Sequence, residues 1–349
     1  MKIASVASAL PPHYYTQEFL SQAMKQYWGE KLPNPRFLDQ LHAHMGVAGR
    51  YLALSIEEYP RITTWGQANS TWIRVAQEIG EQALSLALTR AGLSPPDLSA
   101  LFVVSVTGIA SPSLDARLIN RMGLSPNIRR IPIFGLGCAA GAAGIALVAD
   151  YVRAYPGRSA ALLAVELCSL TMQREDLSTA NLISAGLFGD GAGAVILSGA
   201  ERPATGPRIV STRSVFYPNT ENVMGWDISE KGFQIVLSAD VPVMAERHLA
   251  RDVDALLGDC GLTRADIGSW ILHTGGPKVL EAMASALNLT NGELDASWEC
   301  LRKTGNLSSA SVLLVLEEVM LHRRPAPDTY SVLAAMGPGF CSEIALLKW

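Results

Sequence analysis

The chain has 349 residues, of which 49% are hydrophobic and 17% are charged. A chain of this length buries one large core or two medium cores, and this composition excludes a disordered or coiled-coil protein. Asp and Glu total 32 against 28 for Lys and Arg, giving a net charge of −4, so the chain lacks the basic field with which proteins hold nucleic acid or an anionic membrane surface.

Strand and helix patterns alternate along the chain. Apolar or β-branched runs predict strands at 3–7, 101–106, 160–166, 193–197, 209–216, 270–273, 330–335 and 343–347. Helical patterns cover 70–91, 139–153, 243–257, 277–287 and 307–322. Such alternation predicts an α/β protein in which sheets and helices form layers.

Two parts of the chain repeat one pattern. Gly137-Cys138 opens a helix, and a Pro-Gly turn then leads to the strand AALLAVEL. Gly305-Asn306 opens another helix, and a Pro-rich turn leads to the strand YSVLAAM. Each block continues through a Gly-rich loop into a further strand. We therefore expect a duplicated βαβαβ unit, with one half in residues 1–200, the other in residues 201–349, and a linker at 199–207.

The cysteines and the N-terminus bear on the compartment. Five Cys are spaced irregularly and without a CxxC pair, which disfavours a disulfide framework or a zinc ribbon and favours a reducing compartment. Pro11 and Pro12 break the first apolar stretch, which is too short for a signal peptide. No apolar run approaches the ~18 residues that a membrane helix needs. We expect a cytoplasmic protein.

Three residues carry potential chemistry. Cys138 lies in GLGCAAG, where a thiol at a helix N-terminus is expected to have a lowered pKa, although most free Cys are small buried hydrophobes. His273 follows the apolar run WIL at the carboxyl end of a predicted strand, where open α/β sheets bind ligands, but a lone His is more often structural. Asn306 is equally consistent with a helix N-cap. Together, however, a Cys, a His and an Asn at the openings of elements indicate thiol-based acyl transfer.

Five sequence blocks carry a family resemblance: GLGCAAG, LFGDGAGA, HTGGPK, GNLSSASVLLVLEE and MGPGFCSE. In order and spacing they resemble the signature blocks of the type III polyketide synthases, the chalcone and stilbene synthase family, and the chain looks like a bacterial-type member. The resemblance implies a thiolase-like fold with an α-β-α-β-α layer arrangement, a homodimer, and Cys138, His273 and Asn306 as the catalytic triad. It implies acyl-CoA and malonyl-CoA as substrates and neither a metal nor a redox cofactor.

The resemblance also implies substrate-binding positions. Phe188 matches a gatekeeper between the coenzyme A tunnel and the reaction cavity. Glu166 and Ser308 match a polar network that influences cyclisation, in which Val106 replaces a Thr, so we expect that network to be incomplete. The remaining cavity-lining matches are Thr107, Cys168, Leu170, Thr171 and Ser184.

The chain departs from the family pattern at three places. The second gatekeeper Phe appears as Ile235, with Phe233 two residues earlier, and Ser111 replaces a Met that crosses the dimer interface. The cluster of cations that contacts coenzyme A is also reduced. Arg50 and Lys278 are the best remaining candidates for that contact, and an acyl-carrier protein stays open as an alternative acyl donor.

These departures shape the functional hypothesis. Ile235 and Ser111 are smaller than the Phe and the Met that they replace, which leaves more room for substrate. We therefore expect a fatty acyl starter and alkylpyrone or alkylresorcinol-type products. The alternatives are a malonyl-only tetrahydroxynaphthalene-type synthase, a carrier-protein-dependent ketosynthase, and a catalytically silent binding homologue.

Overall fold

A nine-stranded sheet is the central element of the fold in the computed structural model. The structure describes residues 1–32, 34–290 and 292–349. Its strand order is β11-β12-β13-β8-β1-β7-β6-β4-β5. The strands are β1 (Lys2–Ala9), β4 (Leu98–Val104), β5 (Arg129–Ile133), β6 (Ser159–Leu167), β7 (Asp190–Ser198), β8 (Arg208–Phe216), β11 (Ile267–Leu272), β12 (Tyr330–Gly337) and β13 (Cys341–Lys348).

The sheet consists of two equivalent parts. In the first, β6 is parallel to β4 and antiparallel to β7, which is antiparallel to β1. In the second, β12 is parallel to β11 and antiparallel to β13, which is antiparallel to β8. The parts meet where β1 pairs with β8 at Lys2 and Arg208. The same order and directions recur for four strands of each part, and only β5, at the edge of the first part, lacks a counterpart; this confirms the predicted duplication.

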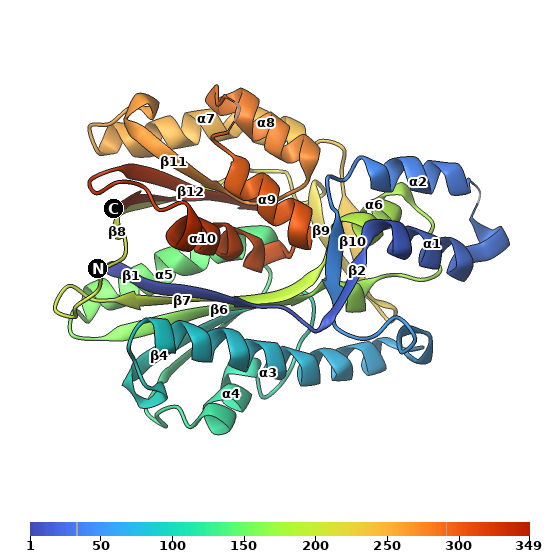
Figure 1. Ribbon diagram of the computed structural model, residues 1–349, viewed down its shortest axis with the longest axis horizontal. Helices are drawn as coiled ribbons and strands as arrows, with labels where there is room; N and C mark the ends of the chain where they lie inside the picture. Colours follow the sequence, from blue (N-terminus) through green and yellow to red (C-terminus); the bar gives the residue numbers. More distant parts are fainter. Residues whose placement is uncertain (33, 291) are drawn as a thin grey trace.

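Helices cover both outer faces and fill the space between the two parts of the sheet (Figure 1). The outer helices are α3 (Trp65–Arg90) and α4 (Leu114–Met122) on one side, and α7 (Val241–Asp259) and α8 (Pro277–Leu287) on the other. The inner helices are α5 (Ala140–Ala154) and α10 (Ser311–His322). This is the expected α-β-α-β-α arrangement, and the thiolase-like fold class is confirmed.

The composition of α5 explains its central position. Its first turns are Ala and Gly on every face and are buried, so the helix has no polar side to turn to water. A Cβ on Gly144 would overlap the side chain of Leu162 on β6, and a Cβ on Gly141 would overlap the backbone of Ser309. The small residues therefore permit the close approach of a strand and of the turn that precedes α10.

Smaller elements gather at one end of the molecule, on the right of Figure 1. They are β2 (His13–Thr16), α1 (Gln17–Trp28), α2 (Pro35–Ala43), β3 (Gly49–Leu52), α6 (Thr179–Leu187), β9 (Met224–Ser229) and β10 (Gly232–Leu237). Helix α9 (Asp295–Thr304) lies nearer the centre of the view, beside α10. Local capping fixes where the first two helices start. Thr16 accepts a hydrogen bond from the Phe19 N–H, and Asn34 accepts one from the Phe37 N–H.

The 3-10 turns lie between these elements, and three of them carry predicted site residues. The turns are η1 (Gly29–Lys31), η2 (Tyr59–Arg61), η3 (Pro95–Asp97), η4 (Gly137–Ala139), η5 (Cys168–Thr171), η6 (Arg264–Asp266) and η7 (Ser308–Ala310). Turn η4 holds Cys138, η5 holds Cys168, Leu170 and Thr171, and η7 holds Ser308.

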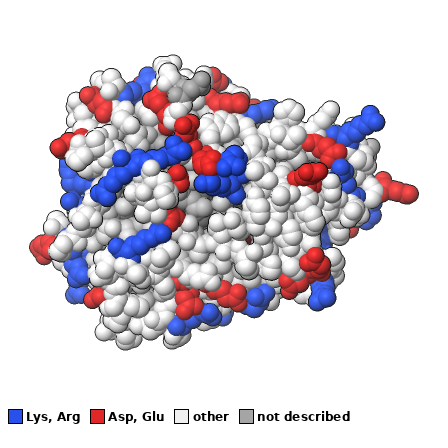
Figure 2. Space-filling model, viewed as in Figure 1, with Lys and Arg blue, Asp and Glu red and all other residues white. Residues whose placement is uncertain are grey.

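The distribution of charged side chains on the surface agrees with the small net charge of the chain. On the face seen in Figure 2, acidic and basic side chains are interspersed rather than gathered by sign. No helix in the described ranges is long and apolar enough to cross a membrane.

Candidate active site

Cys138 lies in turn η4, immediately before helix α5, and is 4% exposed. Gly137 adopts a φ of +49°, and a Cβ there would overlap the ring of Pro338 in the loop that follows β12. A Cβ on Gly337 would in turn overlap Ala139. The glycines of GLGCAAG and MGPGF therefore allow two loops, one from each half, to pack directly around the thiol. The Cys138 Sγ lies 3.6 Å from the Ser308 Oγ.

His273 continues strand β11 by one residue. Its N–H donates to the Ala334 carbonyl of β12 at 3.0 Å, so the ring stands at the carboxyl end of two parallel strands, as the sequence predicted. The side chain is 3% exposed, and among the described residues none hydrogen-bonds to its Nδ1.

Asn306 is fixed from several sides. Its N–H donates to the Leu187 carbonyl at 2.9 Å, and its own carbonyl accepts from the Gly189 N–H at 3.0 Å. The Oδ1 accepts from the Ser308 N–H at 2.8 Å and from the Ser311 hydroxyl at 3.3 Å. Because these donors occupy the oxygen, the Nδ2 amide is left to donate to another group. The Asn306 side chain also opposes the rise in the pKa of the Cys138 thiol, so it faces the candidate site while its oxygen holds turn η7.

Cys138 and His273 are both uncharged in this arrangement. Burial raises the pKa of the Cys138 thiol to about 12, although hydrogen bonds from Ser308 and Asn306 oppose the rise. Burial also lowers the pKa of His273 to about 4. The prediction of a lowered thiol pKa from the helix N-terminus is therefore wrong for this geometry, because desolvation outweighs the helix dipole.

Glu166 is the centre of a buried polar network. Its Oε2 accepts from the Val106 N–H at 3.1 Å, from the Thr107 hydroxyl at 2.8 Å and from the Ser105 hydroxyl at 3.2 Å. Its Oε1 accepts from the Ser309 hydroxyl. Burial raises the pKa of Glu166 to about 7, despite these donors.

Val106 contributes only its backbone N–H to Glu166, a donor that any residue except proline would supply there, so the hydroxyl of the family's Thr is not replaced. The place of Ser308 in the network is corrected. The serine on the Glu166 carboxylate is Ser309, whereas Ser308 contacts the Cys138 thiol. Two adjacent serines in one turn cannot be assigned to two partners from sequence, because the choice depends on the φ of +47° at Ser308.

Three cavities surround these residues. The His273 cavity, of about 440 Å³, is lined by His273, Asn306, Phe188 and Lys278 among others. The Arg50 cavity, of about 420 Å³, is lined by Arg50, Cys168, Ser184 and Phe188 together with apolar side chains of α1. The Phe233 cavity, of about 620 Å³, is lined by Phe233, Leu170, Thr171 and Trp65 among others. The predicted substrate-binding residues are therefore spread over adjoining chambers, with Thr107 and Glu166 in the network beside them.

The two predicted coenzyme A contacts do not lie together. Lys278 lines the His273 cavity, whereas Arg50 lines the Arg50 cavity and is 2% exposed. Its Nη1 donates to the Phe188 carbonyl at 2.6 Å. A guanidinium buried behind Phe188 is not placed to meet phosphates arriving from solvent, so the expectation of a coenzyme A contact at Arg50 is not supported by its position.

The positions chosen for their small size also lie apart from the described cavities. Ile235 is half-buried on β10, opposite Trp226 on β9, and the lining of the Phe233 cavity comes instead from Phe233 and Gln234. Ser111 is exposed before α4 and lines none of these cavities in its own chain. Ile235 therefore gives no support for a fatty starter, whereas the effect expected of Ser111 concerns the cavity of a partner subunit and stays a prediction.

Asp190 was missed by sequence reasoning. It is fully buried, and it accepts from the N–H of Ala53 at 2.6 Å, from the N–H of Ser169 at 2.8 Å and from the Ser169 hydroxyl. It thereby joins three segments, of which the one with Ser169 lines the Arg50 cavity. Its place in the Gly-rich segment FGDGAG indicated a tightly packed loop. The hydrogen-bond donors that surround it, however, are distant in sequence and could not be predicted.

Metal chemistry has no evident centre in residues 1–32, 34–290 and 292–349. No group of three or more His, Cys, Asp or Glu side chains there could hold a metal ion.

Comparison with known proteins follows this geometry. Family models described as chalcone and stilbene synthases, N-terminal domain and C-terminal domain, match residues 2–201 and 208–349. A 1,3,6,8-tetrahydroxynaphthalene synthase from Streptomyces peucetius is 48% identical, over 99% of this chain and 93% of the relative. A 3,5-dihydroxyphenylacetyl-CoA synthase from Streptomyces toyocaensis is 36% identical, over 79% of this chain and 72% of the relative. The crystal structure of 1,3,6,8-tetrahydroxynaphthalene synthase from Streptomyces coelicolor superposes with a TM-score of 0.95 at 32% identity, covering 100% of this chain and 99% of that one.

Proposed function

The chain belongs to the chalcone and stilbene synthase family, the type III polyketide synthases, and on this premise we propose that it builds its product from malonyl-CoA alone. It is an acyl-transferring enzyme that condenses malonyl-CoA. The product we propose is a polyhydroxylated aromatic of the 1,3,6,8-tetrahydroxynaphthalene type, and we expect the enzyme to act as a homodimer.

One observation carries this proposal. The relative at 48% identity, matched along almost the whole of both chains, is named for that product. A tetrahydroxynaphthalene bears hydroxyl groups and no alkyl chain, so a fatty starter has no place in it. The malonyl-only alternative therefore replaces the fatty acyl starter as the leading hypothesis, and nothing in the comparisons supports a carrier-protein donor.

The first step we propose is acyl loading on Cys138. His273 takes the thiol proton, and the sulfur attacks the thioester carbonyl of the first malonyl-CoA. The carbon–sulfur bond to coenzyme A breaks, and the proton held by His273 passes to the departing thiolate. The neutral imidazole supports this role, because a histidine with a pKa of about 4 is ready to accept a proton at neutral pH.

The second step is decarboxylation of the next malonyl-CoA. Loss of carbon dioxide leaves an enolate whose negative charge rests on the thioester oxygen, and the ring N–H of His273 and the Asn306 amide donate to that oxygen. Fixed donors in a dry cavity stabilise such charge strongly, each by roughly 10²–10³ in rate. The enolate carbon then attacks the acyl group on Cys138, which forms the carbon–carbon bond and releases the sulfur.

The polar network supplies a third element. Glu166 has a pKa of about 7 and lies beside the turn that carries Ser308, so it holds a proton part of the time at neutral pH. We propose that it takes part in the proton transfers of ring closure, through Thr107 and Ser309.

The test is incubation with malonyl-CoA alone, followed by incubation with a series of acyl-CoAs. A tetrahydroxynaphthalene in the first reaction, identified by mass spectrometry, supports the proposal, and products only with added fatty acyl-CoA overturn it. Carbon dioxide release that persists in Cys138→Ala but is lost in His273→Ala supports the assigned roles. The absence of turnover with any thioester would overturn the whole proposal.

A further inference from the structure

The buried side chain of Arg50 lies along two loops of the candidate active site. It starts from strand β3 and is 2% exposed. A Cβ on Gly305 would lie 3.1 Å from the Arg50 Cδ and would crowd it, and a Cβ on Gly189 would lie 3.6 Å from the Arg50 Cβ. Gly189 directly follows Phe188, and Gly305 directly precedes Asn306. The stem of Arg50 therefore runs beside the backbone next to both of these residues.

The two loops are joined through their backbones. The Asn306 N–H donates to the Leu187 carbonyl at 2.9 Å, and the Gly189 N–H donates to the Asn306 carbonyl at 3.0 Å. Phe188 and Asn306 thereby form a parallel β-bridge. Because both backbone polar groups of Asn306 are bonded to the segment 187–189, the position of its side chain depends on where that segment lies.

Arg50 and its strand also hold that segment. The Arg50 Nη1 donates to the Phe188 carbonyl at 2.6 Å, and the N–H of Ala53, just after β3, donates to the Asp190 carboxylate at 2.6 Å. Burial lowers the pKa of Arg50 to about 10, with Asp190 opposing the fall, so the guanidinium stays protonated at neutral pH. Its bond to the Phe188 carbonyl is therefore charge-assisted, which makes it about twice as strong as a bond between neutral groups.

The thiol of Cys138 is held by different contacts. Turn η4 packs against Pro338 in the loop after β12, and the Cys138 Sγ lies 3.6 Å from the Ser308 Oγ. Loss of the bond from Arg50 would thus act on the amide donor, while the nucleophile keeps the packing of its own loop. Displacing a catalytic group by about 1 Å through a distant mutation can lower a rate by about 10²-fold.

We propose that Arg50 is a positioning residue for Asn306. By fixing the Phe188 carbonyl it holds the segment 187–189, and the bridge to that segment holds the Asn306 amide where it donates to the thioester oxygen during decarboxylation. This inference rests on the proposed function, because it concerns the donor of the second step. It also accounts for the burial of a cation that the sequence suggested as a coenzyme A contact.

The experiment measures decarboxylation apart from chain growth. In the Cys138→Ala background no acyl chain is loaded, and carbon dioxide release is followed with malonyl-CoA labelled in its free carboxylate. Arg50→Met keeps an unbranched side chain beside Gly305 and removes the donor to the Phe188 carbonyl. We expect this change to lower kcat for carbon dioxide release by about tenfold, with KM changed by less than about twofold.

A double-mutant cycle with Asn306→Ala separates positioning from a general loss of structure. Asn306→Ala alone should slow decarboxylation by about 10²–10³-fold. Because Arg50 acts through Asn306, Arg50→Met should slow the Asn306→Ala protein by less than about twofold further, since residues that share one interaction are not additive. An equal loss in both backgrounds, or no loss in either, would overturn the inference.

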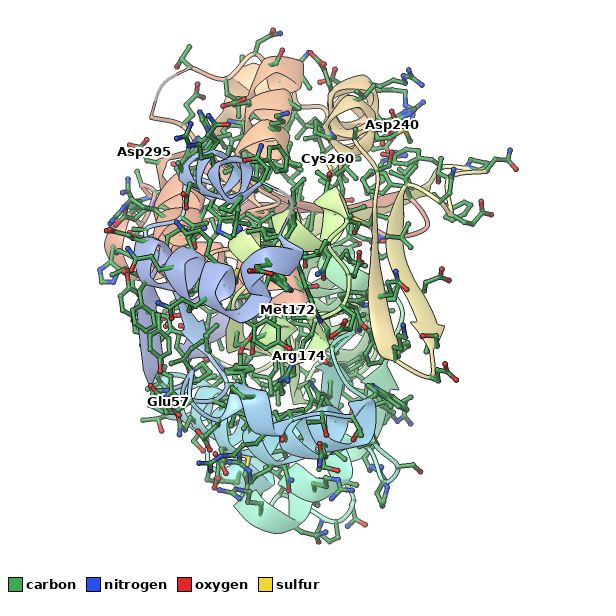
Figure 3. All side chains as sticks on the ribbon, turned by 90° about the vertical axis from the view of Figure 1, so that its right-hand side faces the viewer. Glu57, Met172, Arg174, Asp240, Cys260 and Asp295 are labelled. Atoms are coloured by element: carbon green, nitrogen blue, oxygen red, sulfur yellow. The ribbon has the colours of Figure 1, made fainter. Side chains whose placement is uncertain are left out.

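Arg174 supplies a matched control. Its Nη2 also donates to a backbone carbonyl, that of Tyr59. Figure 3 shows Met172 and Arg174 between helix α1 above and helix α3 below. Because the partner of Arg174 is not in the segment 187–189, Arg174→Met should leave carbon dioxide release unchanged. A loss as large as that in Arg50→Met would also overturn the inference.

A conservative variant and the starting protein complete the test. Arg50→Lys keeps a charged donor and should restore part of the rate. If Arg50→Met does not fold, the same cycle is run with Arg50→Lys, whose smaller loss should disappear in the Asn306→Ala background. A Cys138→Ala protein that releases no carbon dioxide with Arg50 and Asn306 intact would instead overturn the proposed function, and with it the step that Arg50 serves.

Discussion

Replacing Glu166 by Gln should leave stability unchanged at low pH and increase it as the pH rises. The carboxyl is fully buried, and its pKa is raised from an ordinary value of 4.5 to about 7, because burial disfavours the charged form. The folded protein therefore binds this proton more tightly than the unfolded chain. Its contribution to stability is complete below pH 4.5 and is lost as the pH rises through 7.

The magnitude follows from the two pKa values. Each unit of pKa difference corresponds to about 1.4 kcal/mol, so ionisation of Glu166 costs the folded state about 3 kcal/mol at pH 8. Gln keeps the shape: its oxygen can accept from the Val106 N–H, and its amide can donate to the Ser309 hydroxyl. Glu166→Gln should match the wild type near pH 4.5 and exceed its free energy of unfolding by up to about 3 kcal/mol at pH 8.

Urea unfolding at pH 5 and pH 8 measures this difference between the two proteins. Both proteins carry the same other buried groups, including Asp190, whose pKa is raised to about 6 by burial. The pH-dependent contributions of those groups therefore cancel in the difference between the two free energies of unfolding. A stability difference that does not change with pH, or a variant that is weaker at pH 8, would refute the reasoning. Either result would mean that the four donors favour the charged carboxylate over the protonated form.

Other predictions address the thiol and the packing. Iodoacetamide should alkylate Cys138 at pH 7 at least about tenfold more slowly in His273→Ala than in the wild type. Burial raises the pKa of the thiol, and the imidazole is the proposed base that takes its proton. Equal alkylation rates would contradict that role. Gly141→Ala should lower the free energy of unfolding by about 1–3 kcal/mol or more, since the added Cβ would overlap the backbone of Ser309. Gly258→Ala, on an open face of α7 with no atom within 4 Å of the new Cβ, should be neutral or stabilising by up to about 1 kcal/mol in the same thermal and urea assays.

Strong periodic patterns were readable in the sequence. The helix expected at 277–287 is α8 (Pro277–Leu287), and the strand expected at 160–166 is the core of β6. Strand β5 escaped detection because Arg129, Arg130 and Pro132 break any apolar pattern. It forms because it lies at an edge of the sheet, where charged residues and proline are tolerated. The short elements around α1 and α2 were missed for a similar reason, since their stability comes from packing at one end of the molecule.

The sequence by itself determined the α/β class and the duplication, because hydrophobic periodicity and glycine-rich turns are local features, and its family resemblance supplied the three candidate residues Cys138, His273 and Asn306. Tertiary structure alone decided the protonation states of Cys138 and His273, since desolvation depends on everything packed around them. It also decided that Ser309 rather than Ser308 meets Glu166, and that Arg50 is buried behind Phe188 instead of facing solvent. These outcomes depend on contacts between segments far apart in the chain, and no local pattern encodes them.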